Sequence, residues 1–313
     1  MNYEYSKISY PSRDGKSNIC AHVYYPKDKA PKAVIQLAHG MIDHVGRYEG
    51  LADLFCSQGY VFAGNDHLGH GDSVASAEDF GYFAKKDGYE LVIKDLHSFN
   101  SYLSETYGNL PIILMGHSMG SFIARLYAEK YPHTVQGVII HGTAGPNPLL
   151  GVGKLLAKLI KATKGERHRS TTLAALSIGA YAKKFEKTDG KYGWLTRDVS
   201  RVEGRAEDPR TSFAFTASAY HDLFTMLSRC NSREWFAGYP KAMPTLVISG
   251  DADPVGNFGK GPNYVYKQLL IAGCNRVELK MYKDARHELF NETNSDEVFC
   301  DLLAFCDGVL ARL

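Results

Sequence analysis

A serine between two glycines is the first feature of the sequence that could do chemistry. Ser118 lies at the centre of G-H-S-M-G, residues 116–120, which matches the pattern of a nucleophilic serine on a sharp turn between a strand and a helix. The turn needs glycine two positions before and two after the serine, because a Cβ there would collide with neighbouring backbone. The apolar run Ile112–Met115 predicts the strand, and Ser121–Lys130 predicts an amphipathic helix. We therefore predict that Ser118 is a nucleophile.

A serine hydroxyl is a weak nucleophile, so a histidine and a carboxylate must activate it. After a serine turn of this kind the acid comes first along the chain and the histidine second. His287 is the only one of the twelve histidines that lies beyond the last predicted strand. The acid is expected in the loop before that strand, where Asp251 and Asp253 compete. Asp253 is favoured because it lies deeper in the loop and because Pro254 holds it in an extended or turn conformation. Asp251 is then expected to bond its own turn backbone.

Attack by the serine on an acyl carbon creates a negatively charged oxygen, which needs hydrogen-bond donors already in place. One donor is expected to be the backbone N–H of Met119, directly after the serine. The second is expected to be the backbone N–H of Met41, in the loop after the apolar run Ala33–Leu37. Gly40 allows that backbone to approach the site closely. The two methionine side chains are expected to line a pocket.

The elements that must hold these residues follow a regular rhythm. Short apolar, β-branched runs alternate with helical patterns, which predicts an α/β fold with a mostly parallel sheet covered by helices on both faces. Asn18–Tyr25 is expected to belong to an antiparallel hairpin at one edge. The expected strands are Ala33–Leu37, Tyr60–Ala63, Ile112–Met115, Gly137–Ile140, Thr245–Ile248 and Val277–Met281. The expected helices around them are Gly46–Ser57, Leu91–Tyr107, Ser121–Lys130, Gly261–Ala272 and Ser295–Arg312.

One long stretch interrupts this rhythm. About a hundred residues without strand signals separate the run that ends at Ile140 from the run that begins at Thr245. A gap of that length is too long for a loop in a compact domain, so residues 144–239 are interpreted as a helical insert. The expected organisation is a first core part over residues 1–143, the insert over 144–239, and a second core part over 240–313. Helices are expected in the insert at Val152–Lys164, Thr171–Phe185 and Ser212–Arg229.

The ordered motifs together resemble the monoacylglycerol lipase and lysophospholipase group of α/β-hydrolases, and its bacterial members in particular. The segments that carry the resemblance are HGMIDHVGRYEGLA, NDHLGHGDS, GHSMGSFIARLYAEKYP, ISGDADPVG and YKDARHELFNE, with a weaker match, DPRTSFAFTASAYHDLF, in the insert. The resemblance implies an α/β-hydrolase fold in which the insert forms a helical cap. It implies a serine carboxylic-ester hydrolase that cleaves single-chain acyl esters such as monoglycerides through an acyl-enzyme intermediate. A lysophospholipase is the alternative, and neither a metal nor a cofactor is expected.

The resemblance also implies roles for particular residues. It implies the catalytic triad and the two backbone donors that the residues themselves predict, namely Ser118, Asp253, His287, Met41 and Met119. By the same resemblance, Asp43, His44 and Arg47 shape the floor and the polar end of the substrate pocket. An equally good interpretation is that these three side chains form structural hydrogen bonds that hold the loop.

Three other functions are conceivable for a chain with this motif. Hydrolases of the same fold with an aspartate nucleophile are excluded by Ser118. A proline aminopeptidase would need an acidic group in the insert to hold the free amine of its substrate, and Glu203, Glu207 and Asp208 could supply one. A binding protein on a hydrolase scaffold is the third possibility, since a fold alone does not establish an activity.

The segment NDHLGHGDS has residues that could form a metal site. Asp66, His67, His70 and Asp72 are types of residue that bind metals, but they follow a strand in a turn that contains two glycines. A structural loop is therefore the favoured interpretation. The six cysteines are scattered without metal-ligand spacing, which favours reduced, buried thiols.

Composition limits the partners and the location. Hydrophobic residues make up 44% of the chain and charged residues 22%, as in globular proteins that bury a core. The net charge of +2 and the lack of a long arginine-rich stretch argue against nucleic acid as a partner. The first eighteen residues are polar, without the apolar segment of a signal peptide. A cytoplasmic protein with a small lipid-like ester as its substrate is expected.

The insert carries a strongly basic segment. Residues 154–187 contain nine basic residues, six of them before position 170, against two glutamates. Leu155, Leu156, Leu159 and Ile160 fall on one helical stripe there. The favoured interpretation is that these apolar residues roof an acyl pocket while the lysines are solvated. The alternative is that the basic face docks on anionic membrane or micelle surfaces.

Overall fold

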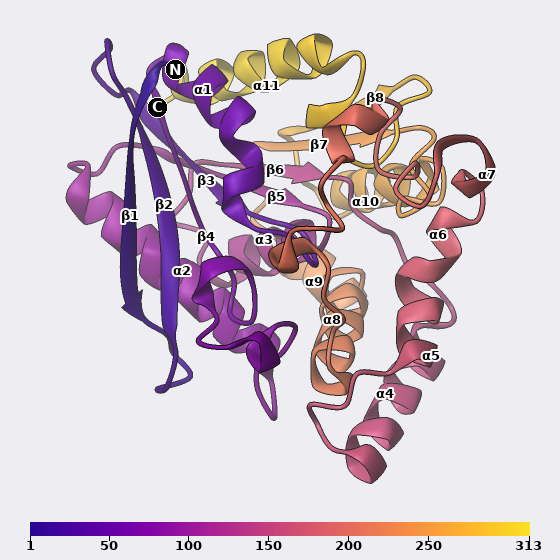
Figure 1. Cartoon of the computed structure of the whole chain (residues 1–313). Helices are drawn as coiled ribbons and strands as arrows, with labels where there is room; N and C mark the ends of the chain where they lie inside the picture. Colours follow the sequence, from indigo (N-terminus) through magenta and orange to yellow (C-terminus); the bar gives the residue numbers. More distant parts are fainter.

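The computed structural model describes residues 1–313 apart from the side chains of Ile178 and Ala180. One eight-stranded sheet forms its centre, in the order β1-β2-β4-β3-β5-β6-β7-β8 (Figure 1). β1 pairs with β2 and β2 with β4 in antiparallel fashion, and the remaining neighbours are parallel. The strands are β1 (Tyr3–Pro11), β2 (Asn18–Pro26), β3 (Ala33–Ala38), β4 (Tyr60–Asn65), β5 (Ile112–His117), β6 (Gly137–His141), β7 (Thr245–Gly250) and β8 (Val277–Tyr282).

Helices cover both faces of the sheet. Ile112 and Leu114 of β5 pack among residues of α2, α3 and α10, whereas Ile113 and Met115 pack among residues of α1 and α11 on the opposite face. Successive side chains of a strand point to opposite faces, so a strand covered on both sides must be apolar along its whole length. The core helices are α1 (Glu49–Ser57), α2 (Gly88–Thr106), α3 (Met119–Lys130), α10 (Lys260–Ile271) and α11 (Ser295–Leu310). The α/β fold that the sequence predicts is confirmed.

The insert lies between β6 and β7 and contains helices but no strand among its described residues. Figure 1 shows α4, α5 and α6 as an arm beside the sheet, with α8 between this arm and the core. α8 contacts α4 on one side and both α2 and α3 on the other. The helices of the insert are α4 (Leu150–Lys164), α5 (Thr171–Ala174), α6 (Ala180–Ala182), α7 (Glu186–Asp189), α8 (Ala217–Cys230) and α9 (Arg233–Gly238).

Two helices of the insert differ from the prediction. The helix expected over Thr171–Phe185 is present as far as Ala182, with a π-helical turn at Ala175–Gly179 between α5 and α6. The helix expected from Ser212 begins only at Ala217, because the side chain of Thr216 accepts a hydrogen bond from the N–H of Ala219 and caps the helix there. None of the helices, over the part of the chain described, is long and apolar enough to cross a bilayer.

Candidate active site

Ser118 occupies a strained turn at the end of β5. Its φ of 54° and ψ of −118° are rare for a residue with a side chain, and α3 begins at the next residue. A Cβ at position 116 would overlap the carbonyl oxygen of Gly120, and a Cβ at position 120 would overlap the carbonyl oxygen of Ala38. Only glycine fits at either position. The two glycines therefore let the turn form, and the turn directs Ser118 away from the strand.

His287 and Asp253 meet behind the serine. The Nδ1 atom of His287 lies 2.9 Å from Oδ2 of Asp253, and both side chains are almost fully buried. The other carboxylate oxygen of Asp253 accepts a hydrogen bond of 2.8 Å from the N–H of Val255, which fixes the orientation of the carboxyl group. Asp251 is exposed and accepts a hydrogen bond from the N–H of Asp284 instead. It bridges two loops rather than bonding its own turn, and it does not contact His287.

The loop after β3 runs beside the serine. A Cβ built on Gly40 would lie 3.4 Å from Cβ of Ser118, so the backbone of this loop approaches the serine closely. His39 is fully buried, and its Nε2 accepts a hydrogen bond of 3.0 Å from the N–H of His67. Its proton is therefore on Nδ1, which donates to the carbonyl oxygen of Gly40 at 2.8 Å. Because a peptide unit is planar and trans, fixing this carbonyl turns the N–H of Met41 in the opposite direction.

A buried cluster of charges holds the rest of this loop. Asp43 accepts hydrogen bonds from Arg47 at 2.8 Å and from the hydroxyl of Tyr48 at 2.8 Å. Glu288, the residue after His287, pairs with Arg47 at 2.9 Å and with Arg205 of the insert at 3.3 Å. Arg205 also donates to the carbonyl oxygen of residue 42 at 3.0 Å. The insert is thereby attached to the loop that contains Met41.

The charges in this cluster balance. Burial alone would raise the pKa of Asp43, but the guanidinium groups of Arg47 and Arg205 outweigh burial and hold this pKa well below its usual range. Burial would likewise raise the pKa of Glu288, and the same two arginines lower it. Both carboxylates are therefore ionised at neutral pH, and each has a cationic partner.

Two further buried histidines flank the site without adding charge to it. His117 and His141 join through their Nδ1 atoms at 3.0 Å, and the ring of His117 lies 4.8 Å from that of His287. Burial lowers the pKa of His117 well below its usual value, and it lowers the pKa of His141 to about 3. Both rings are neutral at physiological pH, so neither opposes a positive charge that forms on His287.

The serine and His287 open into one cavity between the core and the insert. Its volume is about 430 Å³, within the range of small-molecule sites. Met41, Met119 and Asp43 also line it, while His44 and Arg47 are not among its described lining residues. The apolar part of its wall includes Phe122, Leu150, Leu176, Leu223, Phe224, Leu227 and Val255.

The expectation that Leu155, Leu156, Leu159 and Ile160 of the basic segment roof this cavity is wrong, because none of the four is among the described residues that line it. Leu155 and Leu159 of α4 are 58% and 53% exposed, and Leu150 is the residue of α4 that lines the cavity. α4 packs on α8 through its other side, where Ala157 is buried, which leaves these leucines facing outward.

Several residues of the site carry little or no signal in the sequence. Arg205 and Glu288 look like ordinary surface charges, and their burial results from contacts between segments far apart in the chain. Trp194 of the insert lies 5.3 Å, ring to ring, from His287. Of these residues, Glu288 alone had a local clue, since it directly follows the histidine.

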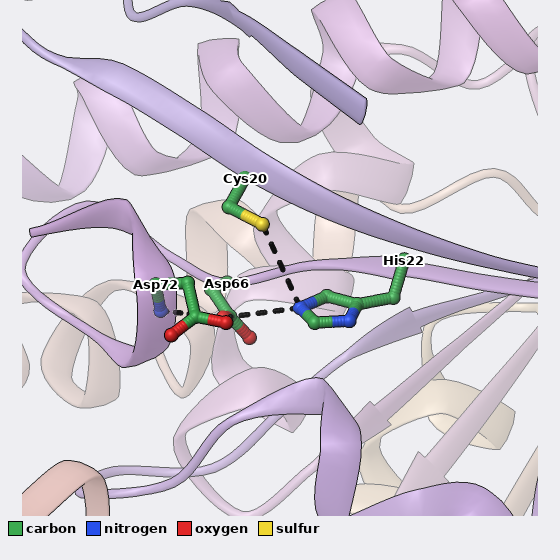
Figure 2. Close-up of side chains that lie close together, drawn as sticks. All are labelled: Cys20, His22, Asp66 and Asp72. Atoms are coloured by element: carbon green, nitrogen blue, oxygen red, sulfur yellow. Dashed lines mark hydrogen bonds and ion pairs between the residues drawn. The ribbon is translucent and has the colours of Figure 1, made fainter. Parts of the chain in front are cut away.

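The residues of the segment NDHLGHGDS that could bind a metal do not line the cavity. His67 and His70 of the segment NDHLGHGDS bond backbone carbonyls of the loop, as the structural interpretation expects. Asp66 and Asp72 instead approach Cys20 and His22 of β2 (Figure 2).

The chain was compared with known proteins. Residues 29–294 match the model of a family described as serine aminopeptidase, S33. The chain is 27% identical to monoglyceride lipase of Homo sapiens over 291 residues, which cover 89% of this chain and 82% of the other. It is 27% identical to monoacylglycerol lipase of Mycolicibacterium smegmatis over 302 residues, 93% of each chain. A highly thermostable carboxyl esterase from Bacillus coagulans superposes with a TM-score of 0.91 at 29% identity, over 98% of this chain and 99% of the other.

The family model spans far more than half of the chain, and similarity to the relatives extends across core and insert alike. The sheet order and the strained serine turn agree with it. The protein therefore belongs to the α/β-hydrolase family described as serine aminopeptidase, S33, and is a serine hydrolase of the esterase and lipase type.

Proposed function

We propose that the protein hydrolyses esters of single acyl chains, monoglycerides above all, through an acyl-enzyme intermediate on Ser118. His287 takes the proton of the serine hydroxyl as the serine oxygen attacks the ester carbonyl, and the N–H groups of Met41 and Met119 bind the oxyanion. His287 then gives the proton to the leaving alcohol. Water attacks the acyl-enzyme in the same way, which releases the fatty acid and restores the serine. Asp253 keeps the His287 proton on Nδ1 and stabilises the imidazolium.

One observation carries this proposal: the serine and the histidine share a cavity whose wall is mostly apolar. Burial of an acyl chain against such a wall contributes about 0.8 kcal/mol per CH₂ group. The nucleophile, the base and the oxyanion donors all come from the chain itself, so the proposed reaction needs neither a metal nor a cofactor. We also propose that residues 144–239 act as a cap over a core formed by residues 1–143 and 240–313.

The charges around the cavity support an uncharged head group. Asp43 and Glu288 are each paired with an arginine, so the buried polar end offers hydrogen bonds without an excess of positive charge, whereas Lys191, which also lines the cavity, is exposed to solvent. A phosphate head group would favour a site with unpaired arginine or lysine. A monoglyceride is therefore favoured over a lysophospholipid, whose hydrolysis remains the alternative. Pocket contacts from Asp43 are part of this proposal, and His44 and Arg47 would act by holding the loop.

The proline aminopeptidase alternative lacks support from the insert. Glu203 and Glu207 are exposed, and neither is among the described residues that line the cavity. Asp208 pairs with Arg210 at 2.9 Å and approaches His44 at 3.2 Å, so it is not free to hold an amine. A binding protein on a hydrolase scaffold would not need the bond between His287 and Asp253.

Contact with lipid surfaces is a further part of the proposal. Leu155 and Leu159 of α4 are exposed beside the lysines of the same helix, an arrangement typical of helices that lie on anionic membranes. Five of the six cysteines are buried free thiols, which supports a cytoplasmic location.

The test measures kcat/KM for a series of monoglycerides of increasing chain length, for lysophosphatidylcholine with the same chains, and for a proline amide. We expect a monoglyceride to be the best substrate. Ser118→Ala should lower turnover by several orders of magnitude and abolish covalent labelling by a fluorophosphonate, with the melting temperature unchanged. A preference for lysophosphatidylcholine would overturn the head-group argument. A wild type that the probe does not label would support the alternative of a binding protein on a hydrolase scaffold.

A further inference from the structure

A cluster of four side chains outside the catalytic cavity has the composition of a metal site. Cys20 and His22 stand two positions apart on β2 and so point to the same face of the sheet. Asp66 follows the end of β4, and Asp72 lies in the turn after it. One ligand atom from each of the four lies within 4.8 Å of the others. We propose that Cys20, His22, Asp66 and Asp72 bind one divalent zinc-class cation.

The distances in the cluster, which correspond to hydrogen bonds in the absence of an ion, are also close to those between ligands of one cation. Nε2 of His22 is 3.3 Å from Oδ2 of Asp66 and 3.7 Å from Sγ of Cys20 (Figure 2). An N–H···O hydrogen bond usually spans about 2.7–3.2 Å. Zinc bonds of about 2.0–2.3 Å in a tetrahedron place neighbouring ligand atoms roughly 3.3–3.6 Å apart. The imidazole thus faces the thiol and the carboxylate at the spacing of three ligands on one ion.

The surroundings already orient these ligands. The hydroxyl of Tyr5 lies 2.9 Å from Nδ1 of His22, on the side of the ring away from the cluster. When Nδ1 donates to that hydroxyl, Nε2 keeps its lone pair for a cation, an arrangement common for metal-binding histidines. Asp66 accepts backbone N–H groups from Val45 at 2.8 Å and from Asp72 at 2.7 Å, one on each oxygen. Each oxygen retains a second lone pair.

The fourth ligand would come from a side chain that can move. Asp72 is exposed and pairs with Lys7 and Arg210 at the surface, so its carboxylate can turn toward the cluster at the cost of weak surface ion pairs. Cys20, His22 and Asp66 are buried. On binding, the thiol of Cys20 releases its proton to solvent and its sulfur binds as thiolate.

The donor set selects the class of ion. Thiolate and imidazole ligands suit zinc and its cobalt substitute, whereas calcium and magnesium take oxygen ligands. The expected role is structural. A cation here would join β2 to the turn after β4 and, through Asp66 and the N–H of Val45, to the loop that ends beside the serine.

The experiment titrates the full chain, freed of metal by a chelator and dialysed, with Co²⁺ alone and records its absorption spectrum. We expect one equivalent to produce the visible bands of four-coordinate cobalt together with a thiolate-to-cobalt charge-transfer band, and Zn²⁺ to remove both. Zn²⁺ should also raise the melting temperature, because a ligand that binds only the folded state stabilises it.

Two variants locate the site. Cys20→Ser should lose the charge-transfer band and the zinc-dependent rise in melting temperature, whereas Cys300→Ser, which changes the exposed cysteine of α11, should keep both. Fluorophosphonate labelling verifies the fold of each variant. If Cys20→Ser does not fold, His22→Gln serves in its place and should weaken cobalt binding at least tenfold. The proposal is overturned if the wild type gives no band with one equivalent of Co²⁺, or if the band disappears in Cys300→Ser and persists in Cys20→Ser.

Discussion

Asp251 and Asp253 occupy the same loop, and their different contacts lead to a direct comparison. Asp253 lies 2.9 Å from Nδ1 of His287, whereas Asp251 bonds the N–H of Asp284. Asp253→Asn should lower kcat by about 10⁴-fold, because an amide cannot hold the tautomer or stabilise the imidazolium. Asp251→Asn should keep most of the activity. The measurement is hydrolysis of a p-nitrophenyl ester by both variants, and the opposite ranking would transfer the role to Asp251.

His39 allows a second test of single contacts. Its Nδ1 holds the carbonyl of Gly40, and its Nε2 accepts from His67. His39→Asn can retain a donor at the position of Nδ1, while His39→Gln retains a polar group at the position of Nε2. We expect Gln to lower kcat at least tenfold with little change in KM, since loss of an oxyanion donor typically costs about 10²–10³ in kcat, and we expect Asn to lower it less. Equal losses in the two variants would mean that the bond to Gly40 does not position Met41.

Local patterns predict those residues whose role depends on their neighbours in the chain. Ser118 needs glycines two positions away, and His287 needs the last strand before it, so both are visible in the sequence. Arg205 and Glu288 become site residues only because segments 83 residues apart meet in the fold. Nothing in the immediate sequence of Arg205 indicates its partner. The pairing of buried charges therefore could not be predicted.

At the scale of elements, α8 carries a buried acid against the start of α2. Asp222 is 3% exposed and one of its carboxylate oxygens has no hydrogen-bond partner among the described groups. Burial raises the pKa of Asp222 to about 7. Asp87 adds to this rise, whereas Lys161 and the N–H groups of Tyr89 and Gly88 reduce it. Because the folded pKa exceeds the unfolded one, the stabilising contribution is present below about pH 4 and is lost as the pH rises through about 7.

Asp222→Asn should therefore melt at a temperature close to that of the wild type at pH 4 and at a higher temperature at pH 8.5. The gain is a few kcal/mol at most, since one pKa unit corresponds to about 1.4 kcal/mol. Melting curves over this pH range provide the measurement. Asp28→Asn, at an exposed carboxylate after β2, is the control and should follow the wild type. A variant that is no more stable than the wild type at pH 8.5 contradicts the prediction.

Elements were predictable in proportion to how completely they are buried. The strands β3 to β7 are buried along their length and mostly apolar because helices cover both faces, and the sequence locates each of them. β1 is mostly exposed and mixes polar with aromatic residues, so it has no such pattern. In the insert, the π-helical turn between α5 and α6 lies inside the helical pattern predicted over Thr171–Phe185. A π-helical turn changes the hydrogen bonding but not the composition, which is why the pattern missed it.

At the scale of the whole molecule, α4 presents an apolar stripe to solvent. Its exposed members are Leu149, Val152, Leu155 and Leu159, at the helical spacing of one face. We expect the wild type to float with liposomes that contain anionic lipid at low salt. Changing both Leu155 and Leu159 to Ser should weaken this binding at every salt concentration, because the loss is of apolar contact. Changing Lys154, Lys158 and Lys161 to Gln should weaken it mainly at low salt, where each charge contributes about 1 kcal/mol.

Ile271→Ser is the matched control, since Ile271 is 77% exposed but lies at the end of α10 in the core. It should float like the wild type. If the wild type does not float at low salt, the membrane-docking proposal is wrong and α4 is a solvated surface helix. The outward position of Leu155 and Leu159 was not predictable, because an amphipathic pattern indicates a stripe without indicating what covers it.

The position of the insert in the chain also affects the order in which the molecule is made. About 170 residues separate Ser118 from His287, and the whole insert lies between them. At a synthesis rate of roughly 5 to 20 residues per second, the serine leaves the ribosome roughly ten to thirty seconds before the histidine. During that interval the nascent chain carries the proposed nucleophile without its proposed base. Under this proposal activity begins only when β7 and β8 join the sheet, so a chain that stalls in translation within the insert should be released as an inert product.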